Sequence, residues 1–125
     1  ERISGADYAD ALFYQRNALA LAMARFHERY DLLLTPSLAL PAFEAGRNTP
    51  ADPSWGDDWT RWTPFTYPFN LTMQPAATLP CGLSREGLPV GLQVVGPMNA
   101  DALVLRASKA YESAFPFARI SQPKG

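Results

Sequence analysis

The chain has 125 residues, of which 47% are hydrophobic and 18% charged, and its formal net charge is -1. This length suits a single unit over residues 1–125 with a real core, while the charge balance argues against a nucleic-acid partner, because no basic excess could release counterions from phosphates. One cysteine excludes an intrachain disulfide, and one histidine argues against a metal site, so we expect no metal and no cofactor.

No stretch approaches the roughly 20 apolar residues that cross a bilayer, and no signal-peptide pattern is present. We therefore expect no membrane partner and a cytoplasmic location, in keeping with the cysteine usage. The chain starts at Glu1 and enters a helical pattern almost at once, which is typical of a fragment of a longer protein. A complete protein that lost its first residues to processing is the alternative.

The first predicted element is a helix over residues 5–28. Ser4 and Asp7 have the spacing of a capping box, in which two side chains satisfy free backbone N–H groups at the helix start. Abundant alanine favours the same structure. One apolar face is predicted from residues that recur at helical spacing, namely Tyr8, Leu12, Leu19, Met23, Phe26 and Tyr30.

Residues 31–36 predict a strand. The apolar run at residues 32–34 is short and continuous and is soon followed by Pro36. This is typical of a strand buried on both faces in the middle of a sheet. Continuation of the helix is the alternative, but Pro36 and Pro41 would stop it.

Residues 41–64, here called the aromatic loop, mix prolines, glycines and aspartates with Trp55, Trp59 and Trp62. Loops above about 12–15 residues in compact domains are usually functional or disordered. Tryptophans argue against disorder, because such side chains become ordered by packing. We interpret the aromatic loop as a surface excursion that covers a groove or a partner.

Residues 75–81 and 88–95 predict an antiparallel hairpin. The intervening residues 84–87 have turn chemistry and end in a glycine that is free to take positive φ. Gly91 in mid-strand indicates a bulge or the close approach of another segment. Alternation in the second strand places Val90, Leu92 and Val94 on one face and Gly91, Gln93 and Val95 on the other.

A second helix is predicted after Asn99, which would cap it, with Asp101 in the first turn where the helix dipole favours an acid. Pro116 would end the helix, and residues 119–125 have the composition of a frayed tail. The apolar stripe of this helix would be Leu103, Ala107, Ala110, Tyr111 and Ala114. Together these elements predict an α/β unit with two main helices and an antiparallel hairpin.

Three motifs occur in a fixed order along the chain. They are YDLLLTP at residues 30–36, FTYPFNLT at 65–72 with QPA at 74–76, and PCG at 80–82 with GLPVGLQ at 87–93. This ordered set resembles the "YD-x-LLTP", "F-x-x-P-x-N-L-T-G-x-P-A" and "P-x-G … G-L-P-V-G-x-Q" segments in the C-terminal region of the amidase-signature family. The resemblance covers essentially the whole chain and implies the C-terminal portion of a larger mixed sheet flanked by helices.

Met73 departs from the family pattern, which has a glycine after Asn-Leu-Thr. A side chain at this position should narrow the adjacent space or shift the turn.

The resemblance implies hydrolysis of a carboxamide in a small-molecule substrate through a Ser-Ser-Lys triad, with backbone amides stabilising the oxyanion. The sequence has no Gly-Ser-Ser-Gly-Gly-Ser loop, and its only lysines are Lys109 and Lys124. We therefore assign no catalytic residue and expect the chain to be inactive alone. Two alternatives are a fragment of the A-type component of a glutamine amidotransferase and a non-catalytic interaction module.

The resemblance implies that the segments after Thr35-Pro36 and before Asn70 face the catalytic groove. An apolar wall for an acyl or aryl group of the substrate would be formed by the aromatic residues Trp55, Trp59, Trp62, Phe65 and Tyr67. Covering a sheet edge or contacting a neighbouring chain is the alternative. Asn70 would bond substrate in the pocket, or act as a helix cap or turn residue. The candidate substrate-binding residues are Thr35, Pro36, Trp59, Trp62, Phe65, Tyr67 and Asn70.

Other reactive side chains have ordinary structural explanations. Cys81 lacks the local signature of a catalytic cysteine, so we interpret it as buried and inert rather than paired with His27. His27 is expected to interact favourably with the helix dipole, because it lies near the C-terminal end of its helix. Asp57 and Asp58 are adjacent and diverge, which indicates a solvated loop. Uncovered strand edges and apolar faces predict an oligomer or pairing with a missing N-terminal portion.

Overall fold

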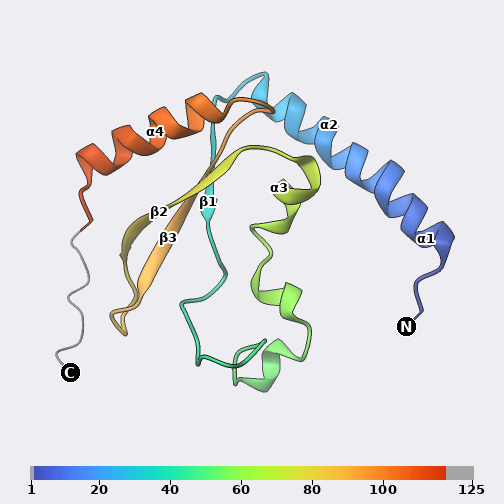
Figure 1. Ribbon diagram of the computed structural model, residues 1–125, viewed down its shortest axis with the longest axis horizontal. Helices are drawn as coiled ribbons and strands as arrows, with labels where there is room; N and C mark the ends of the chain where they lie inside the picture. The colour runs from blue at the N-terminus through green and yellow to red at the C-terminus, as the bar shows by residue number, and fades with distance from the viewer. Residues whose placement is uncertain (1, 118–125) are drawn as a thin grey trace.

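The computed structural model describes residues 2–117 and confirms the α/β arrangement with two main helices and a hairpin (Figure 1). Three antiparallel strands form one sheet in the order β1-β3-β2, namely β1 (Leu33–Pro36), β2 (Ala76–Leu83) and β3 (Pro89–Val95). The α-helices are α1 (Gly5–Asp10), α2 (Arg16–His27), α3 (Tyr67–Thr72) and α4 (Asp101–Ala114). Figure 1 shows α2 and α4 diverging in opposite directions from the same end of the sheet.

The predicted first helix is present over residues 5–27, here called the helical arm, and its capping box is confirmed. The Ser4 hydroxyl accepts from the Asp7 N–H at 3.2 Å, and the Asp7 carboxylate accepts from the Ser4 N–H at 2.9 Å. The predicted apolar face is only partly covered, because the helices of the arm have no buried residue and Tyr8 is 65% exposed.

A π-helical segment, η1 (Ala11–Gln15), separates α1 from α2 and was not predicted. Its wider turn is seen in the bond from the Arg16 N–H to the carbonyl of Ala11, five residues earlier. The same spacing brings the Gln15 amide within 2.8 Å of the Asp10 carboxylate.

β1 lies at the edge of the described sheet, so the prediction of a central strand buried on both faces is wrong. It pairs only with β3, with Leu33 opposite Val95 and Pro36 opposite Leu92, and Leu34 is 57% exposed. Hydrophobicity alone misled the prediction, because it does not distinguish a central strand from an edge strand whose outer side is uncovered.

The hairpin of β2 and β3 is confirmed, with its turn at Gly87 in a positive-φ conformation (80°). Gly91 itself is paired with Pro80, and the register shift lies in the partner strand β2 between Pro80 and Gly82, which is a β-bulge next to Gly91. A Cβ on Gly91 would also lie 2.7 Å from the Ser37 Oγ, so the absence of a side chain permits close approach.

The core lies where α4 covers one face of the hairpin. Leu79, Val94 and Val104 are almost fully buried there. Partly buried residues surround them, namely Leu32, Ala77, Ala107 and Tyr111. The predicted stripe of α4 is therefore partly wrong, because Val104 and Ser108 are its buried residues whereas Ala110 and Ala114 are exposed.

The predicted cap of α4 is also wrong. Asn99 takes a left-handed conformation (φ 62°), which asparagine tolerates better than most residues, and Ala100 is the N-cap without a side-chain bond. Asp101 does lie in the first turn. The helix ends at Ala114, and the predicted tail at 119–125 lies outside the described residues. Among residues 2–117, no helix has the length and apolarity needed to span a bilayer.

Candidate functional site

The aromatic loop is ordered by two short 3-10 turns, η2 (Pro53–Trp55) and η3 (Trp59–Trp62), each opened by an aspartate. The Asp52 carboxylate accepts from the Ser54 N–H at 2.9 Å, and that bond lowers the pKa of Asp52. The Thr60 hydroxyl and N–H both donate to Asp58, at 2.7 and 2.9 Å, and lower its pKa. These turns place the tryptophans without any strand or long helix.

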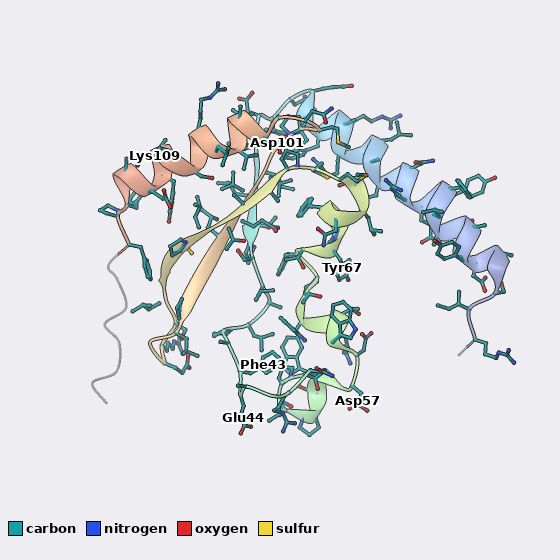
Figure 2. The ribbon with its side chains drawn as sticks, viewed as in Figure 1. Phe43, Glu44, Asp57, Tyr67, Asp101 and Lys109 are labelled. Atoms are coloured by element: carbon teal, nitrogen blue, oxygen red, sulfur yellow. The ribbon has the colours of Figure 1, made fainter. Side chains whose placement is uncertain are left out.

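Trp62 packs inside the aromatic loop and ties its two halves together. Its ring stands edge-on to Phe43 with centroids 5.2 Å apart, and its Nε1 donates to the Asn48 carbonyl at 3.0 Å. Figure 2 labels Phe43 within this loop, at the opposite end of the molecule from α4 and Lys109. Trp59, in contrast, is 58% exposed.

The outgoing flank of the aromatic loop is bonded to the central strand by Gln93. This side chain is only 5% exposed, and its amide lies 2.6 Å from the Phe65 carbonyl and 3.0 Å from the Thr35 hydroxyl. The Thr35 hydroxyl in turn donates to the Pro36 carbonyl at 3.0 Å. Two of the predicted site residues, Thr35 and Phe65, are thus brought together by a residue from β3.

The incoming flank of the loop is bonded to the same strand through Ser37. Its N–H donates to the Gly91 carbonyl at 2.9 Å, and its hydroxyl donates to the Thr78 hydroxyl at 3.1 Å. Ser37 is buried, so these bonds satisfy polar groups that water does not reach.

The remaining predicted site residues are not gathered into one pocket of the described chain. Trp62 is engaged inside the loop, and Tyr67 is 40% exposed at the start of α3. Asn70 is exposed within α3, whose N-cap is Thr66, so its predicted cap or turn role is wrong. Pro36 lines a pocket of about 320 Å³ together with Leu34, Thr35, Cys81, Val90, Gly91 and Leu92. Substrate binding by these residues stays a prediction.

Met73 ends α3 in a left-handed conformation (φ 58°, ψ 30°). Glycine is the residue that helices most often use at such an end, which gives a physical reason for the glycine in the family pattern. The Met73 side chain itself is 66% exposed. Arg16 on α2 supports this end, because its Nε donates to the Leu71 carbonyl at 2.8 Å.

A second pocket, of about 350 Å³, lies between α2 and the residues that follow α3, and it is lined in part by His27 and Gln74. The Gln74 amide lies 2.9 Å from the Gly96 carbonyl and 3.0 Å from the His27 Nε2. Because that amide nitrogen donates to both atoms, the His27 Nε2 accepts and its Nδ1–H donates to the Tyr30 carbonyl at 3.0 Å.

Cys81 is exposed, so its predicted burial is wrong: it sits at the β-bulge, and its thiol lies 3.4 Å from the Val90 carbonyl. It lines the pocket of Leu34 and Pro36, whereas His27 lines the other one. Asp57 and Asp58 are exposed as predicted. No group of three or more potential metal ligands occurs within the part of the chain that is described.

Sequence reasoning missed the buried polar residues Gln93 and Ser37 and the partly buried Gln74 as parts of the site. Gln93 had a usable signal, because a glutamine within an apolar central strand must find hydrogen-bond partners when it is buried. Its partners lie far away in sequence, so the pattern alone did not name them.

Comparisons with known proteins agree with one another. Residues 3–105 match the family model described as Amidase. The chain is 35% identical to the acylamidase of Rhodococcus erythropolis over 94% of its own length and 25% of that protein. It is 39% identical to the A-type component of the glutamyl-tRNA(Gln) amidotransferase of Oceanobacillus iheyensis over 70% of its length and 17% of that protein.

Among solved structures, a bacterial aryl acylamidase of the amidase-signature family superposes with a TM-score of 0.73 and 34% identity, over 91% of this chain and 24% of that one. The chain thus spans about a quarter or less of the length of these relatives.

Proposed function

Since the chain belongs to the amidase family, we propose that it forms the C-terminal, substrate-pocket side of an enzyme that hydrolyses carboxamide bonds. The single unit of residues 1–125 would supply a wall of the pocket. The Ser-Ser-Lys triad would lie on sequence outside this chain, and the chain would be inactive alone.

The bonding of both loop flanks to β3 is the observation that carries this proposal. Ser37 and Phe65 are fixed on one strand, so the aromatic loop between them projects as a defined surface beside Thr35. Within it, Trp59 is 58% exposed and Tyr67 follows at 40%. Exposed aromatic side chains on a fixed support suit an apolar acyl or aryl substituent, because ligand pockets are largely apolar with a few polar anchors.

The described lysine and serines support a triad located elsewhere. Lys109 lies on α4, away from the aromatic loop (Figure 2). Ser108 and Ser113 donate to backbone carbonyls of α4, at 2.8 Å each. Ser37 is bonded to Thr78. None of these serines has a lysine as a hydrogen-bond partner among the described residues.

Uncovered apolar surface supports pairing with further protein. Leu34 on β1 is 57% exposed and Leu83 on β2 is 57% exposed, so both edge strands of the described sheet present apolar side chains. In a chain on its own, unpaired strand edges with apolar side chains tend to bind other protein segments. In the proposed enzyme, the sequence that the relatives have beyond the matched quarter would cover them.

The A-type component of a glutamine amidotransferase is the second candidate function. It is favoured by the 39% identity to the Oceanobacillus iheyensis protein. The match to the acylamidase extends over more of the chain, 94% against 70%, and for this reason we place simple amide hydrolysis first.

A chimera tests the proposal. The matched quarter of the Rhodococcus erythropolis acylamidase is replaced by this chain, and release of 4-nitroaniline from 4-nitroacetanilide is measured beside release of ammonia from glutamine. We expect turnover of the anilide by the chimera and none by this chain alone. Each part alone is the control.

A folded chimera that cleaves neither substrate would contradict the proposal. Preference for glutamine would favour the second candidate. Turnover by the isolated chain would show that its nucleophile is present here.

A further inference from the structure

We propose that Gln93 is a positioning residue of the substrate wall, an inference that rests on the function proposed above. Its buried amide would set the position of the aromatic loop relative to Thr35. It would thereby govern how tightly substrate binds, without touching substrate or taking part in bond cleavage.

The orientation of the Gln93 amide follows from its partners. The Phe65 carbonyl at 2.6 Å can only accept a hydrogen bond, so the nitrogen of the amide faces it. The Thr35 hydroxyl gives its own proton to the Pro36 carbonyl, and it therefore accepts from the same nitrogen. Both side-chain N–H groups of Gln93 thus donate hydrogen bonds, one to Thr35 on β1 and one to Phe65 at the outgoing flank of the aromatic loop.

The position of Gln93 makes this bonding effective. Gly91 and Gln93 are two residues apart on β3 and share one face of the strand. Gly91 receives Ser37 at the incoming flank, and Gln93 holds Phe65 at the outgoing flank. Both ends of the segment from Ser37 to Phe65 are thus bonded to one strand, which holds the base of the loop against the sheet.

Loss of the Gln93 amide would leave the outgoing flank without its donor. Among the described contacts, the hydrogen bonds of Trp62 stay within residues 39–62. Its Nε1 donates to the Asn48 carbonyl, and its carbonyl accepts from the Ala39 N–H. These contacts lie within the loop and do not replace the lost bond to the sheet, so the outgoing half of the loop would open part of the time. When only a fraction of the molecules has the loop in its binding position, the apparent affinity for substrate falls by that fraction.

Tryptophan fluorescence reports this directly, because the three tryptophans of the chain all lie in the aromatic loop. The substitution Gln93→Met keeps length and volume but removes both N–H donors. We expect a red-shifted emission and an acrylamide quenching constant about twofold higher than in the unchanged chain, as a locally opened segment becomes more accessible.

Gln74→Met is the matched control, since Gln74 also donates from one amide to two acceptors but bonds to His27 and Gly96. It should leave tryptophan emission unchanged. Thr35→Val is the second variant, because it keeps side-chain shape and removes only one of the two partners of Gln93. A smaller shift of the same kind is expected. Folded Gln93→Met or Thr35→Val chains with unchanged quenching would overturn the positioning role.

The catalytic consequence is measured in the acylamidase chimera. Because the bond to the Phe65 carbonyl is lost, Gln93→Met should raise KM about tenfold and leave kcat within about threefold. A fall in kcat at constant KM would contradict the inference. An inactive chimera would count against the proposed function, while the fluorescence comparison on the free chain would still decide whether Gln93 holds the loop.

Discussion

The Nε2 atoms of His27 and Gln74 lie 3.0 Å apart, and this bond joins the end of α2 to the segment between α3 and β2. The same Gln74 amide holds the Gly96 carbonyl at the end of β3, so one side chain connects the helical arm to the sheet. The arm has no buried residue in its helices, which makes this polar contact important for its orientation.

The first prediction is that His27 and Gln74 are energetically coupled. His27→Leu and Gln74→Met should each lower the free energy of unfolding by about 1 to 2 kcal/mol, because each leaves a partner unpaired. The double variant should show a coupling of about 1 kcal/mol in a urea-denaturation cycle. His27→Leu combined with Gln93→Met, in a separate network, should be additive. Full additivity in the first pair would refute the contact.

The second prediction concerns strain at Met73. Its φ of 58° is unfavourable for a residue with a Cβ. Met73→Gly should therefore raise the free energy of unfolding by about 0.5 to 1 kcal/mol, because the strain that is relieved exceeds the entropy that glycine adds to the unfolded chain. Met98 is comparably exposed and is not among the positive-φ residues. Met98→Gly should give no gain. Equal thermal-unfolding shifts for both variants would contradict the strain argument.

The third prediction concerns the close approach at Gly91. A Cβ there would lie 2.7 Å from the Ser37 Oγ and 2.9 Å from the Thr78 Cγ2. Gly91→Ala should therefore destabilise the chain by about 1 to 3 kcal/mol, as overpacking does. Gly5→Ala, with nothing within 4 Å, is the control and should be neutral or mildly stabilising. Denaturant midpoints check both, and an undisturbed Gly91→Ala would mean that Ser37 moves freely.

The fourth prediction is an acid-sensitive turn at η3. The Thr60 hydroxyl and N–H lower the pKa of Asp58 below its ordinary value of 3.8. A lowered carboxyl pKa means that the ionised form stabilises the turn: the contribution is complete well above pH 3.8 and is lost as pH falls through the lower, folded value. Tryptophan emission should change over that window. Asp58→Ala should abolish this component, whereas Asp57→Ala should preserve it.

Much of the local structure could be predicted because its causes are local. The capping box of Ser4 and Asp7 uses residues three apart, and the hairpin turn needs only a glycine at position 87. A glycine in mid-strand predicts a bulge or a close approach, and the close approach of Ser37 to Gly91 confirms the second.

The rest depended on distant partners. Nothing in the apolar run of β1 shows that it pairs with β3 and leaves Leu34 exposed. The bond from Gln93 to Phe65 likewise joins residues far apart in sequence, so the candidate site could be named but its support could not. Asn99 failed as a cap because its backbone conformation, which composition does not reveal, starts the helix one residue later.

The π turn at Ala11–Gln15 changes the directions in which the helical arm can make contact. One additional residue in a turn rotates all that follows by roughly 100° about the axis, so apolar side chains before and after it have different headings. Arg16, the first residue of α2, bonds to the Leu71 carbonyl of α3, while Phe13 and Tyr14 remain 62% and 73% exposed. The helical arm therefore presents one face before the π turn and another after it, and it can contact two neighbouring segments that lie on different sides of its axis.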